Sequence, residues 1–346
     1  MKNITKILFV AITSLSLMFS VNAGELTVNG SAKATYNATS GEDQDNGLGV
    51  TNELNFTASG EMDNGYTWSY SMELDPTGTS GPANNDDTQL SLTMNEMGTI
   101  KVCVSECGNN KKYKFDQSAY TNMSDVGTSY GITYPGASGD ANRATIQYHT
   151  PELPFATTVA FAFSTTSVDG SSGNATGSAA NGDSMNEYSL QSSPIDGLTL
   201  HAQVYDFNAY AAGVTTNDQA EEGGAYAATY ALGNATIGYG KSFKAPAILE
   251  AVRAAGATTV EYYENTGMSI GYAVNDDLSV SYTQETSEAN YMTSTTTAYD
   301  IEMDSIQLAY SLGGATLSIA RADVENKGYV NNNDLTETII AMSFAF

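Results

Sequence analysis

The chain has 346 residues, and its 39 acidic residues outnumber 13 basic ones to give a net charge of −26. A protein that binds nucleic-acid phosphates needs the opposite sign, so this class is excluded. With only two cysteines and two histidines, the chain also lacks the ligands of a recognisable zinc site.

The first 23 residues have the layout of a secretory signal peptide. Two lysines open the segment, the apolar run "ILFVAITSLSLMF" (7–19) follows, and "VNA" (21–23) supplies a small-residue cleavage site. The alternative is a retained membrane anchor, for which the apolar run is short. We expect a mature protein of residues 24–346, whose charge is −28 because two lysines of the −26 chain are removed.

Alternation of apolar and polar residues dominates the rest of the chain. In "YTWSYSMEL" (66–74), large apolar residues alternate with Thr, Ser and Glu. This pattern is typical of strands with one apolar and one polar face. Further segments with the same alternation are residues 25–36, 88–94, 155–164, 198–205, 278–282, 305–312 and 336–346. Since no segment after residue 23 is apolar enough for a membrane-spanning helix, any membrane span has to be a closed barrel.

Short and long connections alternate between these segments. Seven have the composition of tight turns: residues 62–65, 95–98, 151–154, 194–197, 233–234, 275–277 and 313–314. Eight are longer and rich in Asp, Asn and Gly: residues near 38–49, 76–87, 105–142, 167–183, 208–222, 245–258, 288–298 and 325–333. Fifteen connections predict sixteen strands.

The fold class predicted from this count is all-β, a 16-stranded antiparallel transmembrane barrel with short periplasmic turns and long extracellular loops. An even strand number lets "TETIIAMSFAF" (336–346) pair with the first strand and close the sheet, which explains its apolar end. A soluble sandwich or solenoid is the alternative. Either would bury a continuous Val, Ile and Leu core, whereas the second face here is Ser, Thr, Asn and Gln, which suits water inside a wide barrel.

The sequence resembles the general bacterial porins. Its terminal "SFAF" is similar to their aromatic-ended last strand, and "NEMGTIKV" (95–102) is similar to the turn and strand that precede their constriction loop. The segment of about 105–142 is by far the longest connection, as loop 3 is in porins, where it folds inward. The resemblance implies a porin barrel over residues 24–346 in the outer membrane of a Gram-negative bacterium.

The resemblance further implies a homotrimer of water-filled channels, surrounded by lipid and lipopolysaccharide, through which ions and small hydrophilic solutes diffuse. No cofactor or metal is expected. A non-conducting barrel that serves as an adhesin or structural surface protein is the alternative. An enzyme is not predicted, because no one Ser stands out as the nucleophile of a Ser–His–carboxylate site.

Parity predicts which charges face the lumen. If the apolar residues face lipid, Lys33, Lys101 and Arg143 point inward and form a basic wall of the kind that faces loop 3 in porins. Glu53 and Glu73 face inward by the same rule, so the alternative is a set of isolated lumen charges paired with these carboxylates.

Loop 3 carries charges of both signs, and these are further candidates for the constriction. They are Glu106, Lys111, Lys112, Lys114, Asp116 and Asp125. Its lysines either attach the loop to an acidic wall or face the solutes, and the sequence leaves both possibilities open.

Cys103 and Cys107 are the two cysteines of the chain. Export to an oxidising compartment favours a disulfide between them at the base of loop 3. Two unpaired thiols are the alternative. The two cysteines are four positions apart, and each residue of an extended chain rises about 3.3 Å. A disulfide between them would therefore require the chain to turn back sharply.

Overall fold

The structure is a computed structural model that describes residues 24–41, 46–76, 83–104, 114–124, 129–135, 144–164, 184–208, 219–248, 254–293 and 295–346. Sixteen strands account for most of this part of the chain. The strands of the first half are β1 (Leu26–Gly41), β2 (Asn46–Glu61), β3 (Thr67–Pro76), β4 (Ala83–Thr93), β5 (Thr99–Val104), β6 (Ala144–His149), β7 (Thr157–Ser164) and β8 (Ser184–Ile195). Those of the second half are β9 (Leu198–Asn208), β10 (Glu222–Leu232), β11 (Ala235–Ala245), β12 (Val260–Ala273), β13 (Leu278–Tyr291), β14 (Ile301–Ser311), β15 (Ala315–Glu325) and β16 (Leu335–Ala345).

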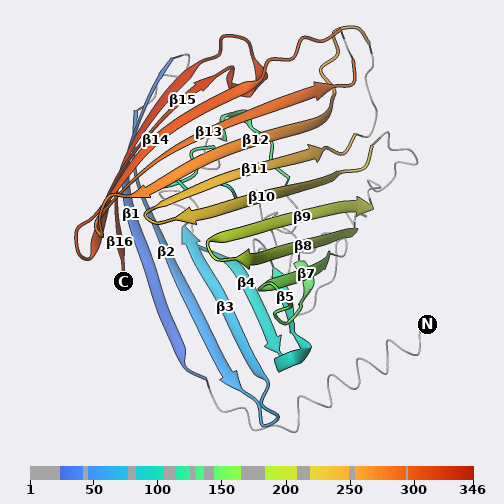
Figure 1. Cartoon of the computed structure of the whole chain (residues 1–346), viewed down its shortest axis with the longest axis vertical. Coiled ribbons are helices and arrows are strands. Elements are labelled where there is room, and N and C mark those ends of the chain that lie inside the picture. Colours follow the sequence, from blue (N-terminus) through green and yellow to red (C-terminus); the bar gives the residue numbers. More distant parts are fainter. Residues whose placement is uncertain are drawn as a thin grey trace.

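The strands form one closed antiparallel barrel in which every strand pairs with its neighbours in sequence and β1 pairs with β16 (Figure 1). Closure is completed at the very end of the chain. Gly30 N–H donates to the Phe346 carbonyl at 2.8 Å, and Phe346 N–H donates to the Gly30 carbonyl at 3.0 Å. The predicted closing strand is therefore confirmed, and the sheet has no free edge.

The seven predicted tight turns are all found between paired strands at one end of the barrel. The turns at Gly233 and Gly313 place these residues at φ of 60° and 73°, a left-handed conformation that glycine adopts without steric cost. Because the strand number is even, both ends of the barrel sequence lie at the turn end.

Two of the long connections are shorter than the sequence indicated. The segments near 38–49 and 76–87 were expected to be loops, but β1 continues to Gly41, β2 begins at Asn46 and β3 reaches Pro76. The ladder continues through polar residues, with Ala38 opposite Asn46. Backbone pairing needs no apolar face, so strands can extend past the region in which alternation marks them.

The two faces of the sheet differ as parity predicted. The outward face carries exposed Leu, Val, Ile, Phe and Tyr side chains, such as Val50, Val204 and Phe161. The inward face is rich in Ser, Thr, Asn and Gln, including the buried Ser281, Thr283 and Gln307. Among the described residues, no helix has the length and apolarity needed to cross a membrane.

A charge on the outward face should cost more than one on the inward face. Phe161 is outward and 42% exposed, whereas Thr158 is exposed on the inner side of the same strand, β7. We expect Phe161→Arg to destabilise the folded barrel by roughly 2–4 kcal/mol if it lies near the bilayer midplane. Thr158→Arg should cost much less, because its guanidinium stays in water.

Reversible denaturant unfolding in lipid vesicles measures both changes in free energy. Phe161→Leu is the control for the loss of the edge-to-face ring contact with Tyr188, whose centroid lies 5.7 Å away. Equal costs for the two arginine variants would contradict the assigned faces of β7.

Candidate functional site

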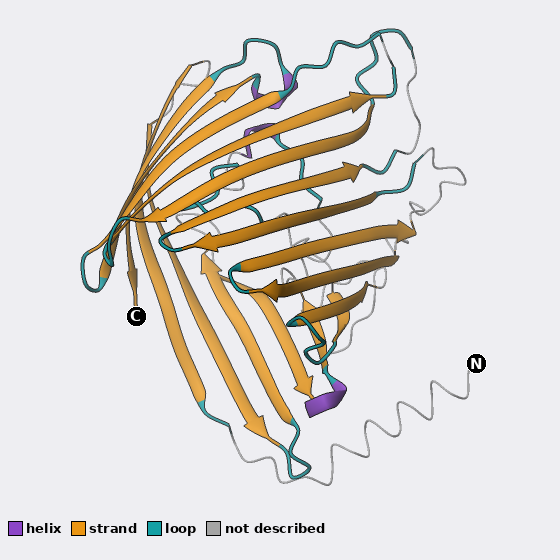
Figure 2. Ribbon diagram, in the orientation of Figure 1, coloured by secondary structure: helices purple, strands orange, loops and turns teal. Residues whose placement is uncertain are grey.

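Loop 3, the segment between β5 and β6, enters the barrel and lies against the inner wall of the second half of the sheet. Its described residues are 114–124 and 129–135. Figure 2 shows these loop segments inside the ring of strands, behind β10–β14. The inward fold that was predicted for this loop is therefore observed for its described part.

Hydrogen bonds to inward side chains hold the loop backbone. Gln117 N–H donates to Ser269 Oγ at 2.9 Å, and Ala119 N–H donates to Ser281 Oγ at 2.8 Å. Gln307 makes three bonds to the loop backbone. Its Oε1 accepts from the N–H groups of Tyr120 and Thr121 at 3.0 Å, and its Nε2 donates to the Thr121 carbonyl at 2.6 Å. Side chains of the wall thus satisfy the hydrogen-bonding capacity of these loop backbone groups.

Inward glycines allow the loop to approach the sheet closely. A Cβ at Gly238 would lie 1.7 Å from the Phe115 carbonyl oxygen, and a Cβ at Gly267 would lie 2.2 Å from the Phe115 ring. Any larger residue at either position would have to displace Phe115, whose side chain is fully buried. These glycines therefore set the distance between loop and wall.

An apolar core joins the loop to β14–β16. Loop residues Met123, Tyr130 and Ile132 are buried against inward residues of these strands. Burying a side chain of this size stabilises by roughly 1.5–3 kcal/mol. The wall residues of this core are Ile301, Met303, Ala320, Ala322, Val324, Leu335, Ile339 and Ala341.

Two buried carboxylates hold tyrosine hydroxyls of the loop. Glu285 on β13 accepts from Tyr134 OH and, at 2.8 Å, from Ser124 Oγ. Glu337 on β16 accepts from Tyr130 OH and, at 2.5 Å, from Asn37 Nδ2. Each carboxyl group bonds both loop and wall side chains or two loop hydroxyls, so these contacts reinforce the loop's position.

The loop leaves the inner wall asymmetric. Inward residues of β12–β16 are buried beneath it, whereas those of β2–β4 and the turn-side half of β5 remain half-exposed or exposed, among them Asn55, Ser71, Gln89 and Lys101. The described part of loop 3 therefore narrows the lumen from one side.

The predicted wall charges of β1–β3 lie on the inner face. Lys33 Nζ sits 5.6 Å from the centre of the Tyr120 ring, so this lysine touches loop 3. Glu53 accepts from Asn55 Nδ2 at 2.8 Å, and Asn55 is opposite Glu73 on the next strand. The structure thus places Lys33, Glu53 and Glu73 on one sector of wall.

Lys101 also faces inward, in a recess of β2–β6, and so stands apart from the Lys33 sector. Asp116 differs from the expectation of a pore-facing charge. Its carboxylate accepts from Ser118 Oγ at 2.7 Å and from Thr283 Oγ1 at 3.0 Å, so it is directed at the wall and attaches the loop. Lys114 is exposed.

The remaining predicted residues lie outside the described part of the chain. They are Glu106, Cys107, Lys111, Lys112, Asp125 and Arg143. Cys103 is buried on the inner face of β5. Its pairing with Cys107 stays a prediction.

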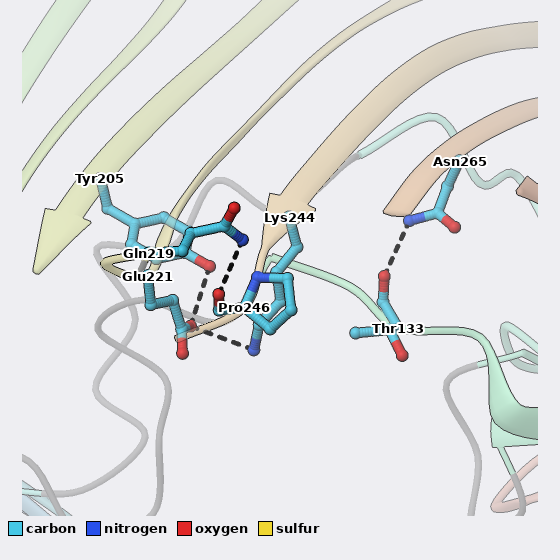
Figure 3. Close-up of polar contacts among 7 residues, drawn as sticks. All are labelled: Thr133, Tyr205, Gln219, Glu221, Lys244, Pro246 and Asn265. Carbon is cyan, nitrogen blue, oxygen red and sulfur yellow. Dashed lines mark hydrogen bonds and ion pairs between the residues drawn. The ribbon is translucent and has the colours of Figure 1, made fainter. Parts of the chain in front are cut away.

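At the loop end of the barrel, Lys244 on β11 forms a partly buried ion pair with Glu221, which directly precedes β10 (Figure 3). Lys244 Nζ lies 3.1 Å from Glu221 Oε1, and Tyr205 OH donates to the same oxygen at 3.2 Å. Gln219 Nε2 donates to the Pro246 carbonyl at 2.9 Å, which ties the two neighbouring loop ends together. Lys244 is thus paired with a carboxylate at the loop end of the barrel.

Burial raises the pKa of two tyrosines, one in loop 3 and one in the connection between β15 and β16. The Tyr120 hydroxyl has a raised pKa, and desolvation raises the pKa of Tyr329 to about 12. Both rings are consequently neutral at ordinary pH. Tyr120 can therefore contact the Lys33 cation through its ring face without becoming an anion.

Comparisons with known proteins bear on this arrangement. A family model described as Gram-negative porin matches residues 11–343. No curated protein matches. Among solved structures, a porin refined at 1.8 Å resolution is 15% identical, with a TM-score of 0.64 over 93% of this chain and 100% of that chain.

Two further structures share the fold at similarly low identity. A loop-L8 deletion mutant of OmpT, an outer membrane protein of Vibrio cholerae, is 14% identical with a TM-score of 0.66 over 94% of this chain and 100% of that chain. A mutant of the Rh. blastica porin is 13% identical with a TM-score of 0.60 over 93% and 100% of the two chains.

A side chain at Gly267 should displace loop 3 while leaving the barrel closed. Gly267→Val would push against the Phe115 ring, whose nearest atom lies 2.2 Å from the added Cβ. We expect the folded barrel to form with a loop that is more accessible to protease and, if the barrel conducts, with noisier single-channel current. Gly47→Ala is the control, because a Cβ there meets nothing within 4 Å. Wild-type protease resistance and current noise in Gly267→Val would contradict the role assigned to this contact.

Proposed function

Because the chain belongs to the Gram-negative porin family, we propose that it forms a water-filled outer-membrane channel for passive diffusion of ions and small hydrophilic solutes. The observation that carries this proposal is the asymmetry of the lumen. Loop 3 covers the inner faces of β12–β16, whereas polar side chains of β2–β4 stay half-exposed or exposed on the opposite side. The described part of the chain thus narrows the lumen but does not fill it on that side.

The orientation follows from the ends of the barrel. The tight turns face the periplasm, and the long loops face outward among the lipopolysaccharide molecules. The outward apolar side chains contact lipid, and the signal peptide of residues 1–23 directs export. The function we propose requires no nucleophile, metal or cofactor.

The charged groups on the inner wall then tune passage. Lys33 and Lys101 are inward cations, Glu53 and Glu73 are inward anions, and the mature chain has a net charge of −28, two below the −26 of the full chain. The large acidic excess favours cations at the channel entrances.

We expect purified protein in a planar bilayer to open in ohmic steps and to prefer cations at low salt. At 10 mM salt the Debye length is ~30 Å, so acidic groups across an entrance act together. The preference, measured as a reversal potential under a salt gradient, should fade near 1 M, where this length is ~3 Å. Anion preference at low salt would mean that the inward lysines dominate. Silence from correctly folded protein would refute the channel and favour a surface adhesin.

We also propose that three barrels associate through the outward face of β1 and β2. The outward positions of β1 include the small residues Gly30, Ala32, Ala34 and Ala38, which allow close approach of a neighbouring backbone. The adjoining outward residues Leu48 and Val50 on β2 are 85% and 66% exposed. By contrast, the outward face of β7–β14 carries many aromatic rings, which suit the lipid interface.

Ala34→Trp should therefore disrupt the trimer, since the indole would keep the neighbouring backbone at a distance. Ala202→Trp on β9 is the matched control, because Ala202 is also an exposed outward alanine. Light scattering of the detergent-solubilised protein gives the assembly mass. A monomer for Ala34→Trp and an unchanged mass for Ala202→Trp are expected. Equal masses of the two variants would place the interface elsewhere.

A further inference from the structure

The inner wall of β2–β6 has a recess of about 500 Å³, between the base of loop 3 and the turn end. These strands form the blue-to-green part of the barrel in Figure 1. The volume of this recess falls in the range of about 300–1,000 Å³ that is usual for small-molecule sites. The lining includes Gln89, Lys101 and His149, together with six hydroxyl side chains: Thr57, Ser69, Ser71, Ser91, Thr93 and Thr99.

Lys101 is the cation of this recess and is flanked by neutral polar groups. It is opposite Ser91 on β4 and Gln147 on β6. None of the lining residues is acidic. Of the inward carboxylates on β2 and β3, Glu53 and Glu73 lie beyond the recess toward the loop end, and Glu61 lies at the turn end of β2, opposite Thr67.

This environment contrasts with that of the ion-paired cations in the described part of the chain. Three other described cations, Lys241, Lys244 and Arg321, each lie within 3.1 Å of a carboxylate. Within the described part of the chain no such ion pair includes Lys101. In a chain with three times as many acidic as basic residues, 39 against 13, an inward lysine away from carboxylates creates a local reversal of charge.

The hydroxyl groups of the recess retain hydrogen-bonding capacity. Ser69 and Ser91 share one bond of 2.5 Å, and Thr93 and Thr99 share another of 3.0 Å. Each hydroxyl can donate one bond and accept two, so these pairs still offer bonds to a guest. His149 Nε2 lies 2.9 Å from Gln147 Oε1, which orients the imidazole at the recess edge.

We propose that this recess is a binding subsite for small polyhydroxylated carboxylates, such as open-chain sugar acids. Lys101 would pair with the carboxylate, and the hydroxyls of β3–β5 would bond the hydroxyl groups of the solute. None of the lining residues is Phe, Tyr or Trp, so the recess offers no large aromatic face on which a ring sugar could stack. An open-chain solute therefore fits its chemistry better than a pyranose.

This inference rests on the proposed channel function and names a class of solute for it. A strongly acidic channel repels carboxylate solutes, and the cationic side chain of Lys101 within the lumen offsets this repulsion. The half-exposed lining favours weak, reversible binding. Weak binding suits passage, because a solute has to leave as well as enter.

Gluconate, sorbitol and acetate are matched probes of the subsite. Gluconate combines the charge with the hydroxyls, sorbitol has only the hydroxyls, and acetate has only the charge. In planar bilayers in 0.1 M KCl, gluconate should block the current at lower concentration than either other solute. Lys101→Gln should raise its half-blocking concentration about tenfold or more, as loss of a charged hydrogen bond predicts.

Three variants make the result specific. Lys101→Arg keeps the charge and should preserve the block, whereas Ser91→Ala should weaken it by about twofold to fivefold through loss of one neutral hydrogen bond. Lys244→Gln, which removes a lysine paired with Glu221, should leave it unchanged. Equal block by acetate and gluconate, or an unchanged block in Lys101→Gln, would overturn the subsite while the channel function stands.

Calorimetric titration of the folded, detergent-solubilised protein separates the two proposals. A heat of gluconate binding that is present in the wild type and lost in Lys101→Gln would support the subsite even if the protein proved non-conducting. In that case the channel function alone fails. Identical heats for wild type and Lys101→Gln would overturn the subsite regardless of conductance.

Discussion

Backbone hydrogen bonding around a closed ring is the constraint on which the rest of this structure depends. Each strand pairs with two neighbours, and the reciprocal bonds between Gly30 and Phe346 complete the ring at the last residue of the chain. Without an edge, the barrel can present apolar side chains on its entire outer surface while its backbone stays fully paired. The inner face is then free to carry polar groups, and the lumen becomes available for loop 3.

The described part of loop 3 is held mainly against β12–β16 and narrows the lumen from that side. Hydrogen bonds that loop N–H groups donate to Ser269, Ser281 and Gln307, together with the apolar core of β14–β16, hold it there. Within the described residues, the inner faces of β2–β4 and of the turn-side half of β5 are not buried by loop 3. The recess around Lys101, which we propose as a solute-binding subsite, includes residues of these strands.

The barrel was predictable from the sequence because its signals are local. Alternation identifies strands, tight-turn residues separate them, and the strand count specifies closure. The ends of strands were less predictable: β1 and β2 run into the polar segment near 38–49, where pairing continues without an apolar face to mark it. The same parity that places Lys33 and Lys101 inward also assigns the inner positions of β13 and β16.

The loop anchors could not be identified in the same way. Glu285 and Glu337 face inward by parity, but the sequence does not say that loop tyrosines meet them. Asp116 was expected to face the pore, yet it contacts Thr283, a residue far away in the chain. A signal was nevertheless present, since the inward glycines of "GYGKS" (238–242) and "GMSIG" (267–271) leave space for an approaching backbone.

The distance along the chain between loop 3 and its anchors constrains the order of assembly. Gln117 bonds a residue 152 positions later, and Tyr130 bonds one 207 positions later. Such contacts form only after the intervening chain has closed a large loop, at an entropic cost that local hairpins do not incur. The hairpins can therefore precede the constriction, and a chain halted before β12 would contain the loop but not the wall that positions it. The part of the lumen that loop 3 narrows is thus built from a segment made early and a surface made late.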